Sequence, residues 1–81
     1  MPRAVRLLLF AAAREAAGTR QVDLTASTVD DVLDQARARF GAAFSAVLDR
    51  SRVWVNGQPS EPSTALSDGD EVAVLPPVSG G

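Results

Sequence analysis

The residues best placed to do chemistry are the last two, Gly80 and Gly81, which the sequence predicts to form a thin carboxyl end. Neither residue carries a Cβ, so this end can enter a slot that is too narrow for any other side chain. The preceding Pro-Pro pair (76–77) cannot donate to a sheet ladder and favours an extended course. We therefore expect residues 76–81 to form a tail that presents the Gly81 carboxylate to another protein, and residues 1–75 to fold as one domain.

The composition removes the side chains that most often catalyse reactions. The 81 residues contain no cysteine and no histidine, and all eight basic residues are arginine. The chain therefore lacks a thiolate nucleophile, a lysine for a Schiff base and an imidazole general base. It also has no thiolate set for a metal or a disulfide. We expect a non-catalytic protein with no bound metal or cofactor, whose carboxyl end is acted on by enzymes formed from other chains.

Length, charge and hydropathy narrow the class further. A chain of 81 residues, of which 46% are hydrophobic, can form one small core and is too apolar to remain disordered. The net charge of −2, without a basic block, argues against a nucleic-acid-binding surface. No apolar run approaches the ~20 residues of a membrane span. We expect a cytoplasmic protein that binds neither nucleic acid nor membrane.

The clearest predicted element is a helix that begins after Thr28. The Thr28 hydroxyl is placed to accept a hydrogen bond from the backbone N–H of Asp31. Apolar residues then recur at helical spacing, and Gly41 stands where a C-cap belongs. Weaker signals predict a helical turn over 11–17 and one more turn within 42–48.

Apolar and β-branched runs predict four main strands, which turn residues separate. Asn56-Gly57 is a strong signal for a two-residue hairpin loop, Pro59 limits the strand that follows it, and the Asp-Gly-Asp sequence at 68–70 marks another turn. The main strands are expected at 4–10, 20–24, 52–55 and 71–75. The first two should pair as an antiparallel hairpin. With the helix, they predict an α+β fold in which a helix covers one face of a sheet.

The face of the sheet turned away from the helix is predicted to carry apolar side chains. By the two-residue period of a strand, Leu7 and Val72 point toward the helix. The apolar residues in the opposite phase are Leu8, Phe10, Ala73 and Leu75. Such a patch either marks a partner surface or is covered by segments 42–50 or 58–66, and the sequence leaves both interpretations open. It also leaves open whether Trp54 lies in the core or at an interface.

Several short motifs, taken in order along the chain, are similar to those of one family. They are Leu9-Phe10-Ala11-x-x-Arg14-Glu15-x-x-Gly18, Val55-Asn56, Leu66-x-Asp68-Gly69-Asp70-Glu71-Val72 and Pro76-Pro77-Val78-Ser79-Gly80-Gly81. This ordered set extends over nearly the whole chain and resembles the MoaD-like sulfur carriers of the MoaD/ThiS family, the small subunits of molybdopterin synthase. The resemblance implies a ubiquitin-like β-grasp fold, with a mixed sheet of four to five strands, one main helix on one face and an extended C-terminal tail.

The resemblance also implies a carrier cycle. In the family, a ubiquitin-activating-like adenylyltransferase uses ATP to adenylate the terminal carboxylate, here that of Gly81. A sulfur donor, a cysteine desulfurase or a rhodanese-like protein, then converts it to a thiocarboxylate. The carrier docks on the large subunit of molybdopterin synthase, in a heterotetramer whose active site lies on that subunit, and gives its sulfur to precursor Z for the molybdopterin dithiolene. The residues implied to contact partners are Phe10, Leu75, Pro76, Pro77, Val78, Ser79 and Gly80.

Three alternatives remain open at this point. A related carrier in thiamine or cysteine biosynthesis would use the same chemistry at the tail. A ubiquitin-like protein modifier would pass the activated carboxylate to a lysine of a substrate protein. A plain interaction module would bind its partner equally well without Gly80 and Gly81.

Overall fold

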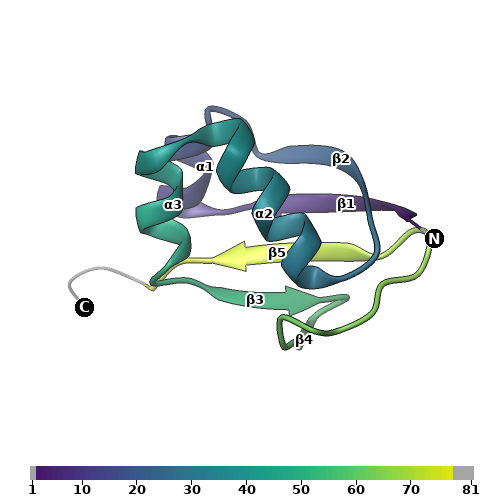
Figure 1. The fold of residues 1–81 in the computed structure, drawn as a ribbon. Coiled ribbons are helices and arrows are strands. Elements are labelled where there is room, and N and C mark those ends of the chain that lie inside the picture. The colour runs from purple at the N-terminus through teal and green to yellow at the C-terminus, as the bar shows by residue number, and fades with distance from the viewer. Residues whose placement is uncertain (1, 78–81) are drawn as a thin grey trace.

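The computed structural model describes residues 2–77. Within these residues, three helices accompany one five-stranded mixed sheet with the strand order β2-β1-β5-β3-β4 (Figure 1). The elements in chain order are β1 (Arg3–Leu9), α1 (Ala11–Ala17), β2 (Gln21–Ala26), α2 (Val29–Phe40), α3 (Ala42–Leu48), β3 (Arg52–Val55), β4 (Gln58–Pro59) and β5 (Glu71–Leu75). All four predicted main strands are present, and β4 is as short as Pro59 requires.

The sheet combines an antiparallel hairpin with a parallel central pair. β1 and β2 run antiparallel, with Val5 opposite Leu24, and β1 runs parallel to β5, with Leu7 opposite Val72. β3 pairs antiparallel with the other edge of β5. The first strand ends one residue earlier than predicted, because Phe10 already serves as the N-cap residue of α1.

Helix α2 follows its sequence signals closely. Its N-cap residue is Thr28, whose hydroxyl accepts a hydrogen bond from Asp31 N at 3.2 Å, and Gly41 ends it with a φ of 86°, a conformation that glycine adopts without steric cost. Val32 and Ala36 are buried against the sheet. Helix α2 therefore covers one sheet face, as predicted.

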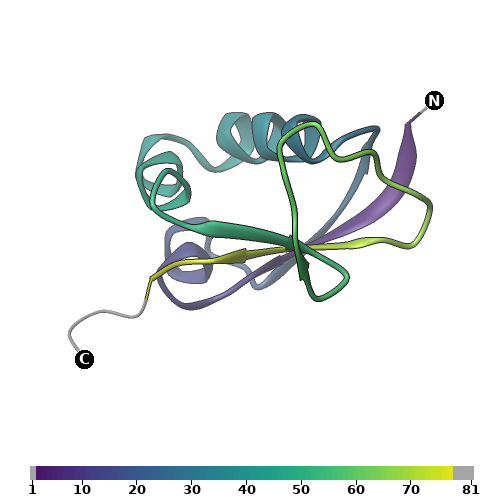
Figure 2. The same ribbon diagram turned by 90° about the horizontal axis from the view of Figure 1, so that it is seen from below.

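Helices α1 and α3 span the two ranges, 11–17 and 42–48, in which the sequence predicted helical turns. Each has seven residues, and they pack against each other at the end of the sheet where β1 and β5 end. Figure 2 shows α2 and α3 on the same side of the sheet. Phe44 of α3 is fully buried, although its sequence position gave no sign that it belongs to the core.

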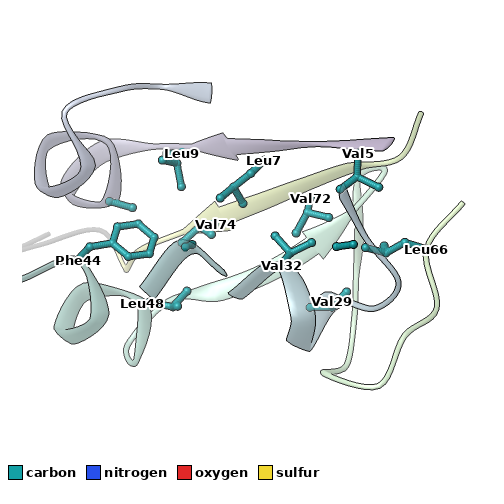
Figure 3. Close-up of a cluster of buried hydrophobic side chains, with 13 residues drawn as sticks. Val5, Leu7, Leu9, Val29, Val32, Phe44, Leu48, Leu66, Val72 and Val74 are labelled. Atoms are coloured by element: carbon teal, nitrogen blue, oxygen red, sulfur yellow. The ribbon is translucent and has the colours of Figure 1, made fainter. Parts of the chain in front are cut away.

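The core lies between the sheet and the helices. The side chains of Leu7, Val72 and Val74 point from the central strands toward Val32 and Phe44 (Figure 3), and all five are fully buried. Full burial of such a side chain contributes about 1.5–3 kcal/mol each. In the described part of the chain, no helix is long and apolar enough to cross a membrane.

Candidate functional site: the open face of the sheet

The sheet face opposite α2, called the open face below, carries the predicted apolar patch. Leu7 and Val72 are buried in the core, so alternation turns the intervening side chains to the other side. Leu8, Ala73 and Leu75 are half-buried there.

A row of apolar side chains crosses the open face at right angles to the strands. Leu8 lies opposite Ala73, Ala73 lies opposite Trp54, and Trp54 lies opposite Pro59. These four residues, one from each of β1, β5, β3 and β4, form the apolar row. Side chains directly opposite each other on one face lie within contact distance, so the row is a continuous strip.

The structure settles the position of Trp54. Val53 and Val55, on either side of it, pack against the core, and Trp54 therefore points to the open face, where it is half-buried. The sequence left this residue open between core and interface. The deciding observation is that both flanking valines pack against the core.

Phe10 and Leu75 extend the apolar surface toward the end of the chain. They follow Leu9 and Val74, which lie opposite each other, so both leave the sheet at the same end. Phe10 is 45% exposed, and among the large hydrophobic residues of the described chain it is the one that is classed as exposed. Ala11, next to it, has a φ of 49°, a left-handed backbone that costs a non-glycine residue about 1 kcal/mol. This sharp turn starts α1 while Phe10 stays extended and accessible.

The chain leaves the sheet beside a groove on the helix side of the same end. Pro76 is half-buried and Pro77 is exposed. The groove has a volume of about 520 Å³ and is lined by Ala11, Ala12, Glu15, Val47, Arg50, Pro76 and Pro77. The remaining predicted site residues, Val78, Ser79, Gly80 and Gly81, lie outside the described residues.

The other end of the open face is polar. Arg6 lies between Asp23 and Glu71 on the neighbouring strands, and its Nε atom is 3.1 Å from Asp23 Oδ1. Both side chains of this pair are largely exposed, at 46% and 77%, and such a pair contributes at most about 1 kcal/mol. Together with Thr25 and Gly69, among others, these residues line a shallow recess of about 490 Å³.

The turn at 68–70 fastens this polar end. Asp68 Oδ1 accepts a hydrogen bond from Ala4 N at 2.9 Å, and Gly69 N donates to the Ala4 carbonyl at 2.8 Å. Gly69 has a φ of 86°, as the turn signal predicted. The predicted turn is thus also a clamp on the start of β1.

Asn56 and Asp70 connect this turn to the β3–β4 hairpin. The Asn56 amide donates to Asp70 Oδ1 at 2.9 Å and its oxygen accepts from Glu71 N at 2.9 Å. Asp70 Oδ2 accepts from the backbone N–H of Ser67 at 2.8 Å. The Ser67 bond first, and the Asn56 bond second, hold the pKa of Asp70 below its ordinary value. These three bonds are called the Asn56–Asp70 lock below.

Neither segment that the sequence offered as a cover folds over the open face; of these segments, only the short strand β4, with Pro59, lies at its edge. Helix α3 places Phe44 and Leu48 in the core. The loop after β4 binds the start of α2 instead, where Val29 N donates to the Thr64 carbonyl at 3.0 Å and Asp30 N donates to the Pro62 carbonyl at 2.8 Å. Residues 2–77 therefore leave the apolar row and Phe10 uncovered. They also contain no group of three or more side chains arranged to hold a metal ion.

Comparison with known proteins gives the relatives of this chain. The model of the ThiS family matches residues 7–81. The molybdopterin synthase sulfur carrier subunit of Chlamydomonas reinhardtii is 36% identical over 84 residues, which cover 95% of this chain and 98% of that protein. SAMP1 from Haloferax volcanii has a TM-score of 0.86 and 35% identity, with 96% of this chain and 99% of that chain covered.

More distant structures share the fold alone. One is the complex of subunits 1 and 2 of molybdopterin-converting factor from Helicobacter pylori, which matches with a TM-score of 0.75 at 20% identity, over 96% of this chain and 99% of that chain. With the five-stranded mixed sheet, these likenesses confirm the predicted α+β, ubiquitin-like β-grasp fold.

Proposed function

Because the chain belongs to the ThiS family, we propose that it is a sulfur carrier and the small subunit of a molybdopterin synthase. The observation that carries this proposal is the match, over nearly the full length of both proteins, to a molybdopterin synthase sulfur carrier subunit. The open face adds support, because it places an uncovered apolar surface next to the residues from which the tail starts.

The proposed reaction begins at the Gly81 carboxylate. A carboxylate is a poor electrophile, since its leaving group would be oxide. An adenylyltransferase therefore joins it to the α-phosphate of ATP, and pyrophosphate leaves. A sulfur nucleophile delivered by a cysteine desulfurase or a rhodanese-like donor then bonds to the carbonyl carbon, and AMP leaves with the electron pair of the broken C–O bond. The donor's sulfur arrives as the outer atom of a cysteine persulfide, so this step gives an acyl disulfide. A second thiol then attacks the donor cysteine sulfur, a disulfide forms on the donor, and the thiocarboxylate leaves with the electron pair of the broken S–S bond.

The thiocarboxylate supplies a nucleophilic sulfur to a chain that has no cysteine. In the proposed cycle it attacks precursor Z in the active site of the large subunit, and the dithiolene of molybdopterin is built there. Six extended residues, 76–81, span about 20 Å at ~3.3 Å per residue, which is enough to reach a buried site from a docked domain. The proline pair stiffens the base of the tail, so less entropy is lost when it enters the site.

Docking is assigned to the apolar end of the open face. Phe10 and Leu75 would contact the large subunit, as would the tail from Pro76 to Gly80, with two carriers and two large subunits per assembly. The Helicobacter pylori structure is described as a complex of subunits 1 and 2, which supports a partner of this kind. Apolar anchors that become fully desolvated are the side chains that dominate protein interfaces.

The proposal is tested by the intact mass of the protein after incubation with an activating enzyme of this family, ATP and a sulfur source. We expect a gain that corresponds to the replacement of one oxygen by sulfur, and no gain when Gly81 is deleted. Gly81→Ala, or one residue added after Gly81, should impair loading or delivery while the fold stays intact. Normal synthase activity in both variants would rule out the proposed role of the tail.

A protein modifier is the second candidate, and a specific observation favours it: the 35% identity to SAMP1, a small archaeal modifier protein. A second observation separates the two, because a modifier would form lysine conjugates of higher mass in a cell lysate, whereas a sulfur carrier would not. A loaded carrier that gives no molybdopterin with the large subunit and precursor Z would instead serve thiamine or cysteine biosynthesis.

A further inference from the structure

The sequence contains unusually few groups that an activated carboxyl end could acylate. All eight basic residues are arginine, and there is no cysteine, histidine or tyrosine. Amines, thiolates and imidazoles attack acyl adenylates and thioesters. The arginine guanidinium stays protonated in proteins and does not act in this way. The amino terminus is therefore the one amine of this sequence.

The contacts of the arginines do not explain why lysine is absent. Arg6 and Arg37 form ion pairs, and Arg39 lies over the ring of Phe40 at 5.9 Å. The other five are exposed and form no side-chain hydrogen bond or ion pair within residues 2–77: Arg3, Arg14, Arg20, Arg50 and Arg52. A lysine would keep the charge and most of the aliphatic stem at these five positions. The structure therefore does not require arginine at these five positions.

One of these arginines stands at the base of the tail. Arg50 lines the groove that Pro76 and Pro77 also line. The four residues from 78 to 81 have a reach of at most about 13 Å. A primary amine at position 50 would therefore lie within reach of the Gly81 carbonyl carbon.

The amino-terminal end of the fold is at the opposite end of the sheet. β1 and β5 are parallel, with Arg6 opposite Glu71. β1 begins at Arg3 and β5 ends at Leu75, and Figure 1 shows the two points at opposite ends. Measured along the strand direction, the start of β1 and the end of β5 are about seven residue steps of ~3.3 Å apart, or roughly 20 Å. The start of the fold is thus remote from the base of the tail.

We propose that this chain can donate its activated carboxyl group but offers no side chain that could accept one. This proposal rests on the function proposed above. An activated Gly81 finds no side-chain amine or thiol on its own surface or on another copy of the chain, and the amino-terminal end of its own fold is remote from the base of the tail. Only a nucleophile from a different molecule forms the new bond to the carbonyl carbon, AMP leaves, and the proton of the nucleophile passes to solvent. If the chain is attached to a protein, it is attached as a single unit and does not form polymers through its side chains.

The test uses the full chain with a small-molecule thioester installed chemically at Gly81, so that no activating enzyme is needed. Wild type, Arg50→Lys and the matched control Arg3→Lys are held at mildly alkaline pH and followed by intact mass. Wild type should yield only the hydrolysed acid. Arg50→Lys should yield a lactam, one water lighter than the acid, at least about tenfold faster than Arg3→Lys and independently of protein concentration. Any product of Arg3→Lys should be a dimer that forms faster as the concentration rises.

Two outcomes would overturn the proposal. One is a wild-type thioester that forms cyclic or dimeric product as fast as Arg50→Lys does, since the amino terminus would then be an effective acceptor. The other is an Arg50→Lys thioester that survives as long as wild type, since lysine at the tail base would then be harmless. Both results are independent of the sulfur-loading experiment, whose failure would reject the proposed function and leave this chemistry untouched.

Discussion

The two ends of the open face differ in whether their side chains find interaction partners within the fold. At the polar end, the side chains of the Asn56–Asp70 lock and the Asp68 carboxylate that clamps Ala4 all find hydrogen-bond partners within the fold. At the apolar end, Trp54 and Leu75 are half-buried and Phe10 is exposed. Hydrogen bonds can be completed within one small fold, whereas an apolar surface left open gains stability only when a partner excludes water from it.

This difference separates the two tasks of the sheet. The polar end holds β1, β5 and the β3–β4 hairpin in register, which fixes the positions of the side chains at the other end. The apolar end contributes little to the core and is free to be shaped for a partner. Substitutions at the apolar end should therefore change binding with little effect on folding, and substitutions at the polar end should do the reverse.

The largest effect is expected from Leu75→Asp. The change removes an apolar contact worth about 1.5–3 kcal/mol and places a carboxylate where docking would strip its water. We expect the affinity for the large subunit to fall at least about 100-fold, or ~2.7 kcal/mol, in a calorimetric titration. Phe10→Asp should act in the same direction.

Thr25→Asp is the matched control, because it adds the same charge at an exposed position on the polar end of the open face. Its affinity should equal that of wild type. If all three variants are folded and bind the large subunit with equal affinity, the interface lies on another surface of the protein.

Trp54→Ala should have the next largest effect on binding. Tryptophan is enriched among the side chains that dominate interfaces, and Trp54 lies at the centre of the apolar row. We expect about tenfold weaker binding, with a loss of unfolding free energy below about 1 kcal/mol, because only its cross-strand contacts are removed. A stability loss as large as that of a core truncation would mean that Trp54 belongs to the core.

Local signals predicted much of this fold, and long-range pairing accounts for what they missed. The Thr28 cap, the Asn56-Gly57 hairpin and Gly69 are short-range features, and the structure has each where the sequence placed it. The burial of Phe44 and the apolar row depend on how distant segments meet. The parallel register of β1 with β5 joins residues 65 positions apart, from Arg6 to Glu71, and no local pattern specifies it.

The candidate site divides in the same way. Phe10 and Leu75 were predicted from alternation within single strands, and both lie at the surface. Trp54 and Pro59 join them only through the pairing of β3 with β5 and β4. Asn56 was predicted as a turn residue, and its second role, as the amide that binds Asp70, requires a turn formed 14 residues later.

Asn56→Asp tests the polar end. Aspartate tolerates the φ of 50° at this position, but it replaces the donor to Asp70 with a second carboxylate. We expect the unfolding free energy to fall by about 1–2 kcal/mol, measured by urea denaturation with Trp54 fluorescence, while the affinity for the large subunit stays unchanged.

Gln58→Glu serves as the control for this substitution, since it adds the same charge at an exposed position two residues away. It should leave stability as it is. If both variants lost stability equally, the effect would come from net charge and the lock would have no special role.

The smallest expected effect is the dependence of stability on pH that Asp70 causes. Because hydrogen bonds lower the pKa of folded Asp70, its contribution to stability is fully present above the pKa of an unfolded aspartate, about 3.9. It is lost as the pH falls through the lower, folded value. Asp70→Asn removes the ionised acceptor, so this variant should be less stable than wild type at neutral pH.

The gap in unfolding free energy between wild type and Asp70→Asn should narrow as the pH falls below about 4, since wild type then loses the same ionised group. Urea unfolding at a series of pH values measures it. Asp68→Asn is the comparison within the same turn, because its carboxylate accepts one backbone bond whereas Asp70 accepts two hydrogen bonds. A gap for Asp70→Asn that stayed constant with pH would mean that the lock depends on the shape of the side chain. If this gap in unfolding free energy narrows, the polar end of the open face is stabilised by the ionised carboxylate of Asp70, which the fold keeps hydrogen-bonded. The apolar end has no such internal partner within residues 2–77, and this is the difference between the two ends.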